Sequence, residues 1–212
     1  MSRALTTTTY GVLGLIAVRP YSTYELAKAM GLSVGRVWPR AESKLFEEPK
    51  KLVEHGYAKA REESTGRRPR TVYSITGAGR RALAAWLAEP GDGPALEFEG
   101  LVKLMFAEHG SRADALETIA RARAWAVEMN TANIAAGQRF AKGEGRHEER
   151  RATTLLMGAF LTDFYALVAR WADWAAAEVE DWPEDIAGHR IPPEMTRAVL
   201  ARATWSQSEG EN

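Results

Sequence analysis

The chain has 212 residues, of which 45% are hydrophobic and 26% charged, a composition typical of a folded globular protein with room for two modest domains. It contains no cysteine, which excludes disulfides and thiolate-based sites and suits a reducing compartment. The longest apolar run, Tyr10 to Val18, is much shorter than the roughly 20 residues of a membrane-spanning helix, and the first nine residues lack the layout of a signal peptide. We therefore expect a cytoplasmic protein that does not enter a membrane.

The formal net charge is zero, but the charges are unevenly distributed along the chain. Residues 1–89 hold 15 Lys and Arg against 8 Asp and Glu, a net charge of +7, and residues 90–212 hold 13 against 20, a net charge of −7. A basic first half joined to an acidic second half indicates that only the first half meets phosphates. Chance segregation of surface charge between two domains would give the same net charges, so sequence motifs are needed to distinguish it from binding to phosphates.

The first two predicted elements are helices with clear local boundaries. Thr6 to Arg19 carries a helical apolar pattern that Pro20 stops. Ser22 and Glu25 have the spacing of a capping box, in which each side chain binds the other residue's backbone N–H, so a second helix begins there. Gly31 is a natural residue to follow the end of this second helix.

A third helix and a hairpin follow. The third helical pattern covers Pro39 to Glu54, with Gly56 after its end. Tyr57 to Glu63 and Arg70 to Ile75 are typical of two strands, and Ser64 to Pro69 of the turn that joins them. The order of three helices and a two-stranded hairpin predicts a winged helix-turn-helix.

Only helices are predicted after the hairpin. Thr76 can cap a fourth helix that runs through Leu87, and the stretch Pro90 to Pro94 has the composition of a linker. Further helical patterns cover Leu96 to Ala107, Arg112 to Phe140, His147 to Val179 and Glu194 to Thr204, with a break at Lys142 to Gly145. We therefore predict a mainly α protein with a winged-helix domain at residues 1–89 and an all-helical domain at residues 90–212.

The third helix has the pattern expected of a DNA-recognition helix. On a helical wheel its apolar strip contains Ala41, Leu45, Pro49 and Leu52, and the opposite side contains Arg40, Ser43, Lys44, Glu47, Lys50 and Lys51. We predict DNA contacts from Arg36, Arg40, Ser43, Lys44, Lys50 and Lys51, with base-edge contacts near the N-terminal end of the helix. Glu47 lies among these cations, and we expect a neighbouring lysine to pair with it.

The hairpin tip is strongly basic. Arg67, Arg68 and Arg70 surround Pro69, and Gly66 allows a tight backbone turn. Arginine is attracted by the concentrated negative potential of a narrow minor groove, so these three residues are predicted to contact DNA. A solvated surface loop is the alternative, since basic turns are common.

The sequence of this region resembles the PadR family of transcriptional regulators. The resemblance covers about residues 5–88 and rests on "YGVLGLIAVRPYSTYELAKAM", "LFEEPKKLVEHGYAKA" and "RRPRTVYSITGAGRRALAAWL". The positions that match the family pattern are Leu52, Gly56, Tyr73, Ile75, Thr76, Gly79, Arg80, Trp86 and Leu87, and of these Leu52, Tyr73 and Ile75 are expected in the core, with Gly79 at a close-packing position. Two departures are Phe46, where the family usually has Tyr, and Pro49, which should kink the recognition helix.

The second half resembles the larger PadR type, which has a helical C-terminal domain, on the strength of "FEGLVKLMFAE" and two long helices. Their apolar stripes comprise Leu116, Ile119, Ala122, Ala126 and Met129 on one helix, and Leu156, Phe160, Phe164, Leu167, Trp171 and Trp174 on the other. Such faces can bury against each other and against a second subunit, so we expect a homodimer that binds a pseudopalindromic operator in duplex DNA. The resemblance implies a repressor that a small aromatic or hydrophobic ligand releases.

The candidate ligand-binding residues are Trp125, Phe160, Phe164, Trp171 and Trp174. Tryptophan as a filler of the core or of the dimer interface is the commoner role.

Other functions find little support in the sequence. The four histidines are scattered without metal-ligand spacing, and neither a phosphate-binding glycine loop nor a nucleophile elbow is evident, so we expect no enzyme, cofactor or metal. The alternative that stays open is a winged helix used for protein–protein contact, in which the basic wing would meet an acidic partner.

Overall fold

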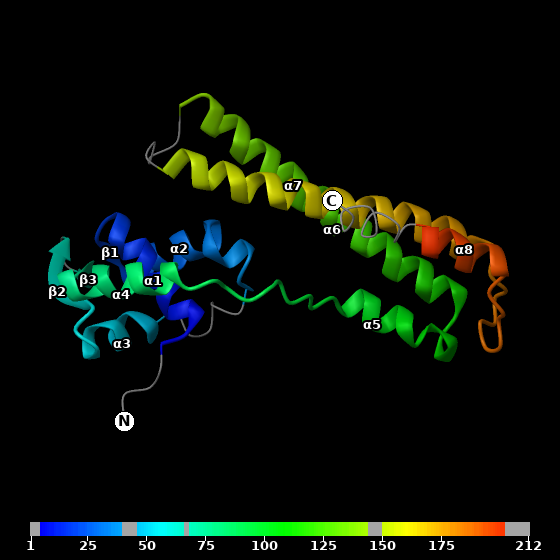
Figure 1. Ribbon diagram of the computed structural model, residues 1–212, viewed down its shortest axis with the longest axis horizontal. Helices are drawn as coiled ribbons and strands as arrows, with labels where there is room; N and C mark the ends of the chain where they lie inside the picture. The colour runs from blue at the N-terminus through cyan, green and yellow to red at the C-terminus, as the bar shows by residue number, and fades with distance from the viewer. Residues whose placement is uncertain (1–4, 40–45, 66–67, 144–149, 202–212) are drawn as a thin grey trace, which may run out of the picture. The chain divides into compact units, whose positions relative to one another are not determined.

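The computed structural model describes residues 5–39, 46–65, 68–143 and 150–201 (Figure 1). The chain divides into two compact units, Met1–Pro94 and Ala95–Asn212. This division falls at the end of the predicted linker, a few residues after the expected boundary at 89/90.

The first unit contains four α-helices, a short 3₁₀ helix and three strands in its described part. In chain order they are α1 (Thr7–Val18), β1 (Tyr21–Ser22), α2 (Thr23–Leu32), η1 (Val34–Arg36), α3 (Glu48–Glu54), β2 (Ala58–Thr65), β3 (Arg68–Ile75) and α4 (Gly77–Ala88). The predicted order of helices, hairpin and fourth helix is confirmed.

Local hydrogen bonds explain where the helices begin. The Ser22 side chain accepts from the Glu25 backbone N–H, and the Glu25 carboxylate accepts from the Ser22 backbone N–H at 2.8 Å, which confirms the predicted capping box. The Thr76 hydroxyl caps α4 by accepting from Gly79 N–H at 3.0 Å, as expected. A further capping box at α1, between Thr6 and Thr9, was not predicted.

Three predicted details of these helices are wrong. The third helix was expected to run from Pro39 to Glu54, but α3 begins only at Glu48, and residues 46 and 47 before it form a turn. Gly31 does not follow the end of α2, because the helix continues to Leu32 and Ser33 is its C-cap residue. Pro49 does not interrupt the described helix, because α3 begins at Glu48 and places Pro49 in its first turn, where proline removes no intrahelical hydrogen bond.

The sheet has the strand order β1-β3-β2, and both pairings are antiparallel. The hairpin is longer than predicted, since Ser64 pairs with Pro69 and Thr65 with Arg68. β1 was not predicted; it pairs Tyr21 with Tyr73 and so links the entry to α2 with the closing strand of the hairpin. Two residues are too short a segment to show an alternating pattern in the sequence.

The core of this unit lies between the helices and the sheet. Its buried members are Val12, Leu13, Leu15, Ile16, Tyr21, Leu26, Met30, Leu52, Ala58 and Tyr73, and Ile75 packs against them. Leu52 and Tyr73 are core residues as expected. Gly79 is buried, and a Cβ atom there would overlap the backbone carbonyl of Tyr57, which confirms the predicted close packing.

The described part of the second unit consists of helices and the loops between them, without a strand. It contains α5 (Glu99–Met105), η3 (Ala107–His109), α6 (Arg112–Ala141), α7 (Arg151–Glu180) and α8 (Pro193–Ala201). α6 and α7 form a long antiparallel pair (Figure 1), in which Asn133 of α6 donates to the Gly158 carbonyl and the Thr162 hydroxyl of α7 at 3.0 and 2.8 Å.

α7 buries a different face from the predicted one. The buried stripe is Leu161, Tyr165, Val168, Ala172, Ala175 and Val179, whereas Leu156, Phe160 and Leu167 are more than half exposed. On α6 the predicted Ile119, Ala122 and Ala126 are buried as expected.

By length and composition α7 is long and apolar enough to cross a membrane, and among the described helices it alone meets that test. A long helix in the core of a soluble protein also meets the test, so this is weak evidence for a membrane protein. The buried stripe of α7 has its partner within the protein, because it packs along α6.

Candidate nucleic-acid interface

The third helix is held in place by three buried residues on its inner side. Glu48 is 1% exposed and Leu52 is 0% exposed, and the side chain of Pro49 is also fully buried. Pro49 and Leu52 belong to the predicted apolar strip. Lys50 lies on the exposed side of the helix, as expected of a residue that could meet DNA.

Lys51 has a charge partner within the protein. Its Nζ lies 2.5 Å from Oε1 of Glu48, and the Lys51 side chain is 26% exposed against 1% for Glu48. The other carboxylate oxygen of Glu48 accepts a hydrogen bond of 2.5 Å from the Thr9 hydroxyl of α1. Lys51 therefore pairs with Glu48, a residue that the helical wheel left unassigned, and the expected pairing of Glu47 with a neighbouring lysine stays a prediction.

Several predicted DNA contacts fall outside the described residues. They are Arg40, Ser43, Lys44 and Arg67. Arg68 begins β3, but its side chain is not among those described. Arg36 ends η1 and is half-buried.

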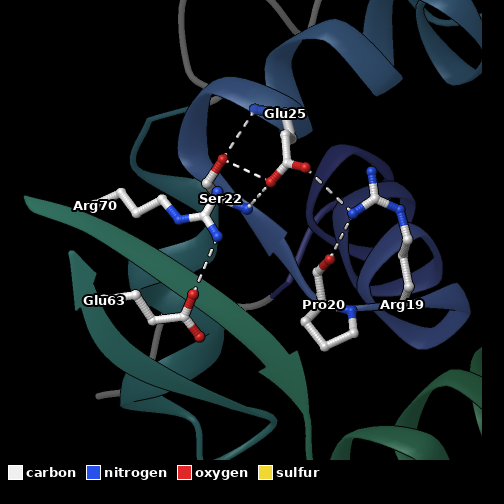
Figure 2. A network of polar contacts seen from close by, with 6 residues as sticks. All are labelled: Arg19, Pro20, Ser22, Glu25, Glu63 and Arg70. Carbon is white, nitrogen blue, oxygen red and sulfur yellow. Dashed lines mark hydrogen bonds and ion pairs between the residues drawn. The ribbon is translucent and has the colours of Figure 1, made fainter. Parts of the chain in front are cut away.

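The wing places an ion pair and two further cations on its strands. Arg70 and Glu63 face each other across the hairpin, and Nη2 of Arg70 lies 3.1 Å from Oε2 of Glu63 (Figure 2). Lys59 and Arg61 of β2 are exposed, and side chains two residues apart point to the same face of a strand. Sequence reasoning missed these two cations because it looked only at the hairpin tip.

A second polar network fixes the start of α2. Arg19 contacts the Glu25 carboxylate at 3.3 Å and the Pro20 carbonyl at 2.9 Å, while Glu25 also binds Ser22 (Figure 2). The Arg19 guanidinium lies 3.8 Å from the centroid of the Tyr21 ring. Hydrogen bonds from the Ser22 backbone and side chain, with help from Arg19, lower the pKa of Glu25. This network orients the first helix of the helix-turn-helix against the sheet.

The five candidate ligand residues form two groups. One contains Trp125 of α6 with Phe160 and Phe164 of α7, and the other contains Trp171 and Trp174 of α7. Trp125 meets Phe164 edge-on at 6.2 Å, and Phe164 stacks with Phe160 at 6.5 Å. The half-buried Trp171 meets Phe98 edge-on at 5.9 Å, and it packs with Trp174 against the core formed by the ends of α6 and α7. Tyr165, which is buried at 5.5 Å from Trp125, belongs to the first group and was not predicted.

An open hollow of about 400 Å³ lies elsewhere in the helical unit, and its lining includes Val102, Phe106 and Ser111. No group of three or more His, Cys, Asp or Glu residues that could hold a metal ion occurs in the part of the chain that the structure describes.

Three helices, a three-stranded sheet and a basic hairpin define the first unit as a winged helix-turn-helix domain. Residues 12–85 match the family described as "Transcriptional regulator PadR-like family". The chain thus carries a PadR-like domain, followed by an additional helical unit.

Comparison with individual proteins agrees with this assignment. The chain is 28% identical over 79 residues to the negative transcriptional regulator PadR of Bacillus subtilis strain 168, a match that spans 37% of this chain and 43% of that protein. The crystal structure of Bacillus subtilis PadR in complex with operator DNA has a TM-score of 0.70 and 18% identity, covering 82% of this chain and 99% of that one. The same protein in complex with p-coumaric acid has a TM-score of 0.61 and 17% identity, covering 84% and 99%.

The curated relative is matched over less than half of its own length. At these identities the structural matches establish that the fold is shared, including the presence of a helical region after the winged helix.

Proposed function

We propose that the protein is a sequence-specific DNA-binding regulator of transcription. The observation that carries the proposal is a PadR-like winged helix whose α3 and wing present exposed cations, including Lys50, Lys59, Arg61 and Arg70. Cations at this density favour a phosphate-lined partner, because binding releases the counterions condensed on DNA. The Bacillus subtilis protein that shares the fold binds operator DNA, which supports the same use here.

The proposed DNA face combines α3 with the wing. α3 would enter the major groove, and the wing would follow the backbone or reach the minor groove. Arg40, Ser43 and Lys44, which precede α3 in the chain and lie outside the described residues, are proposed to contact the bases. The proposed contacts are Arg36, Arg40, Ser43, Lys44, Lys50, Arg67, Arg68 and Arg70. Lys51, which the sequence also placed in this set, is treated in the next subsection.

A homodimer would present two such faces. The apolar side of α7 that α6 leaves uncovered includes Leu155, Leu156, Phe160 and Leu167, each more than half exposed. Contiguous apolar surface of this kind is covered by a partner in most soluble proteins, and a second copy of the chain offers the same surface in return. Two-fold symmetry would then require a pseudopalindromic operator with half-sites about one helical turn, or a multiple of it, apart.

We further propose repression that an aromatic or hydrophobic small molecule relieves. The curated relative is a negative regulator, and its structure with p-coumaric acid supports a phenolic or similarly flat ligand. In this chain we assign the ligand to the group formed by Trp125, Phe160 and Phe164, since Trp171 and Trp174 already pack against the core of the helical unit. A ligand that binds the DNA-free arrangement more tightly would shift the population away from the DNA-bound one. A regulator of this kind acts in the cytoplasm and needs no catalytic residue.

Selection of bound sites from a random duplex library, with purified protein at moderate salt, tests the proposal. Enrichment of a palindrome with half-sites about one turn apart supports a dimeric specific regulator. Affinity for the selected site should fall by about 10³–10⁵ between 50 and 200 mM salt if about 6–10 phosphates are contacted. No enrichment, together with weak binding that vanishes at physiological salt, would overturn the proposal in favour of an acidic protein partner for the wing.

A further inference from the structure

We propose that Glu48 tunes DNA affinity by fixing α3 on α1 and by withholding the Lys51 ammonium from the phosphates. This inference rests on the proposed function, because it concerns how the winged helix meets DNA. It makes Glu48 a positioning residue and removes Lys51 from the contacts expected from the sequence.

Both carboxylate oxygens of Glu48 have interaction partners inside the protein. Its side chain is 1% exposed, Oε2 accepts from the Thr9 hydroxyl at 2.5 Å, and Oε1 receives the Lys51 ammonium at 2.5 Å. Each oxygen thus has a different partner. An ionised carboxylate is buried only where such partners replace water, because an unpaired charge in the interior is strongly disfavoured.

The bond to Thr9 joins α1 to α3 through two residues that lie 39 positions apart in sequence. Thr9 is 1% exposed and belongs to the capping box of α1, where its hydroxyl lies 3.0 Å from that of Thr6. Pro49 and Leu52 also anchor α3, but they do so through apolar contacts, which have no preferred direction. A short hydrogen bond to a charged group is directional, so Glu48 fixes the rotation of α3 as well as its depth.

The ion pair changes the charge that α3 can offer to DNA. Lys50 and Lys51 are adjacent, yet Lys50 is exposed while the Lys51 side chain is 26% exposed and its charge is balanced by Glu48. Moving Lys51 to a phosphate would leave the buried carboxylate without its cation. The phosphate would have to outweigh that loss, so the ammonium stays with Glu48 when DNA binds.

The test is the salt dependence of binding to one duplex by the full-length protein and its Glu48→Gln, Lys51→Gln, Lys50→Gln and Glu48→Gln/Lys51→Gln variants. Glutamine keeps the size of Glu48 and an oxygen that can accept from Thr9, but it removes the charge that holds Lys51. We expect Glu48→Gln to bind more tightly at low salt, and its slope of log K against log salt to steepen by about 0.9 for each subunit that contacts the DNA.

The other variants attribute this gain to Lys51. Lys51→Gln alone should leave the wild-type slope unchanged, and the double variant should lose the gain of Glu48→Gln. Lys50→Gln is the matched control for an exposed cation on the same helix and should make the slope shallower. Circular dichroism and thermal unfolding establish that each variant is folded. The double variant leaves no buried charge unpaired, so it keeps the test decisive should a single variant fail to fold: its slope should equal that of the wild-type protein, and a shallower slope would overturn the inference.

The possible failures are distinguishable. Salt-dependent binding by the wild-type protein with a shallower slope for Lys51→Gln would overturn this inference alone, as would a folded Glu48→Gln variant with the wild-type slope. Absence of salt-dependent binding by the wild-type protein would overturn the proposed function and this inference with it. An increase that only Glu48→Gln shows is not expected of a residue whose role is purely structural, since a loosened helix would weaken binding.

Discussion

Replacement of Gly79 by alanine should destabilise the winged-helix unit, although alanine is the better helix former. Gly79 lies in the first turn of α4, and a Cβ atom there would overlap the Tyr57 carbonyl oxygen and lie 2.9 Å from Cγ1 of Ile75. The carbonyl belongs to the backbone and already accepts from Thr76 N–H at 3.0 Å, so it cannot turn away without losing that bond. The added methyl group therefore has to displace α4 or the chain that leads into β2.

The magnitude follows from two opposing terms. Overpacking of this kind costs about 1–3 kcal/mol of unfolding free energy. Loss of a glycine from a helix returns at most about 1 kcal/mol, and less in a first turn. The expected net loss is about 1–2 kcal/mol, which lowers the melting temperature of a unit of this size by about 4 °C or more.

Gly14 of α1 provides the matched control, because a Cβ atom there meets no other atom within 4 Å. Gly14→Ala should raise the free energy of unfolding by about 0.5–1 kcal/mol. The assay is thermal and urea unfolding of the full-length protein, followed by circular dichroism. Equal stabilisation by both substitutions would refute the reasoning, since it would mean that α4 does not pack against Tyr57 as closely as described.

Four further outcomes are expected. Asn133→Ala should lower the free energy of unfolding in urea by about 1–3 kcal/mol, because a buried side chain loses two hydrogen bonds between α6 and α7; an unchanged midpoint would contradict this. The pKa of Glu25 is lower in the folded protein than in the unfolded chain, so the carboxylate stabilises the fold above the pKa of the unfolded chain, and this stabilisation is lost as the pH falls through the pKa of the folded protein. The melting temperature of Glu25→Gln should therefore fall less than that of the wild type when the pH is lowered below about 5. A parallel pH profile for variant and wild type would argue against the network. Leu156→Glu should shift the protein to monomer in light scattering, because it puts a charge on the proposed dimer face, and a dimer of undiminished affinity would exclude that face. Lys44→Ala should change base preference in site selection, whereas Arg68→Ala should weaken binding evenly across sequences; if neither affinity nor preference changes, the proposed DNA face is wrong.

Sequence and structure agree most closely where a structure depends on neighbours along the chain. The capping box of Ser22 and Glu25 and the cap at Thr76 each involve residues three apart, so the sequence contains both partners. The break before Gly143, whose φ is 75°, follows from the same kind of local chemistry. Gly31 was misplaced because a glycine can follow a helix or lie within its last turn, and packing decides between them.

Sequence-based prediction and structure disagree mainly where a contact joins segments that lie far apart in the chain. β1 exists because Tyr21 and Ser22 find Tyr73 and Val72 of β3, about fifty residues later, and a two-residue segment carries no pattern of its own. The face that α7 buries was predicted from its largest apolar side chains. The structure instead buries a neighbouring stripe that combines larger residues such as Leu161 with Ala172 and Ala175, whose small side chains allow α6 and α7 to approach closely.

The sequence by itself determined the winged helix, its order of elements, most of its helix boundaries and the concentration of positive charge in the first half of the chain. These properties follow from hydrophobic periodicity, capping chemistry and composition, all of which are local. Only the tertiary structure decided that Glu48 is buried and that it joins Thr9 of α1 to Lys51 of α3. A helical wheel separates polar from apolar residues, but it cannot show that a carboxylate on the inner side meets a hydroxyl 39 residues away, because that meeting depends on how α1 and α3 pack.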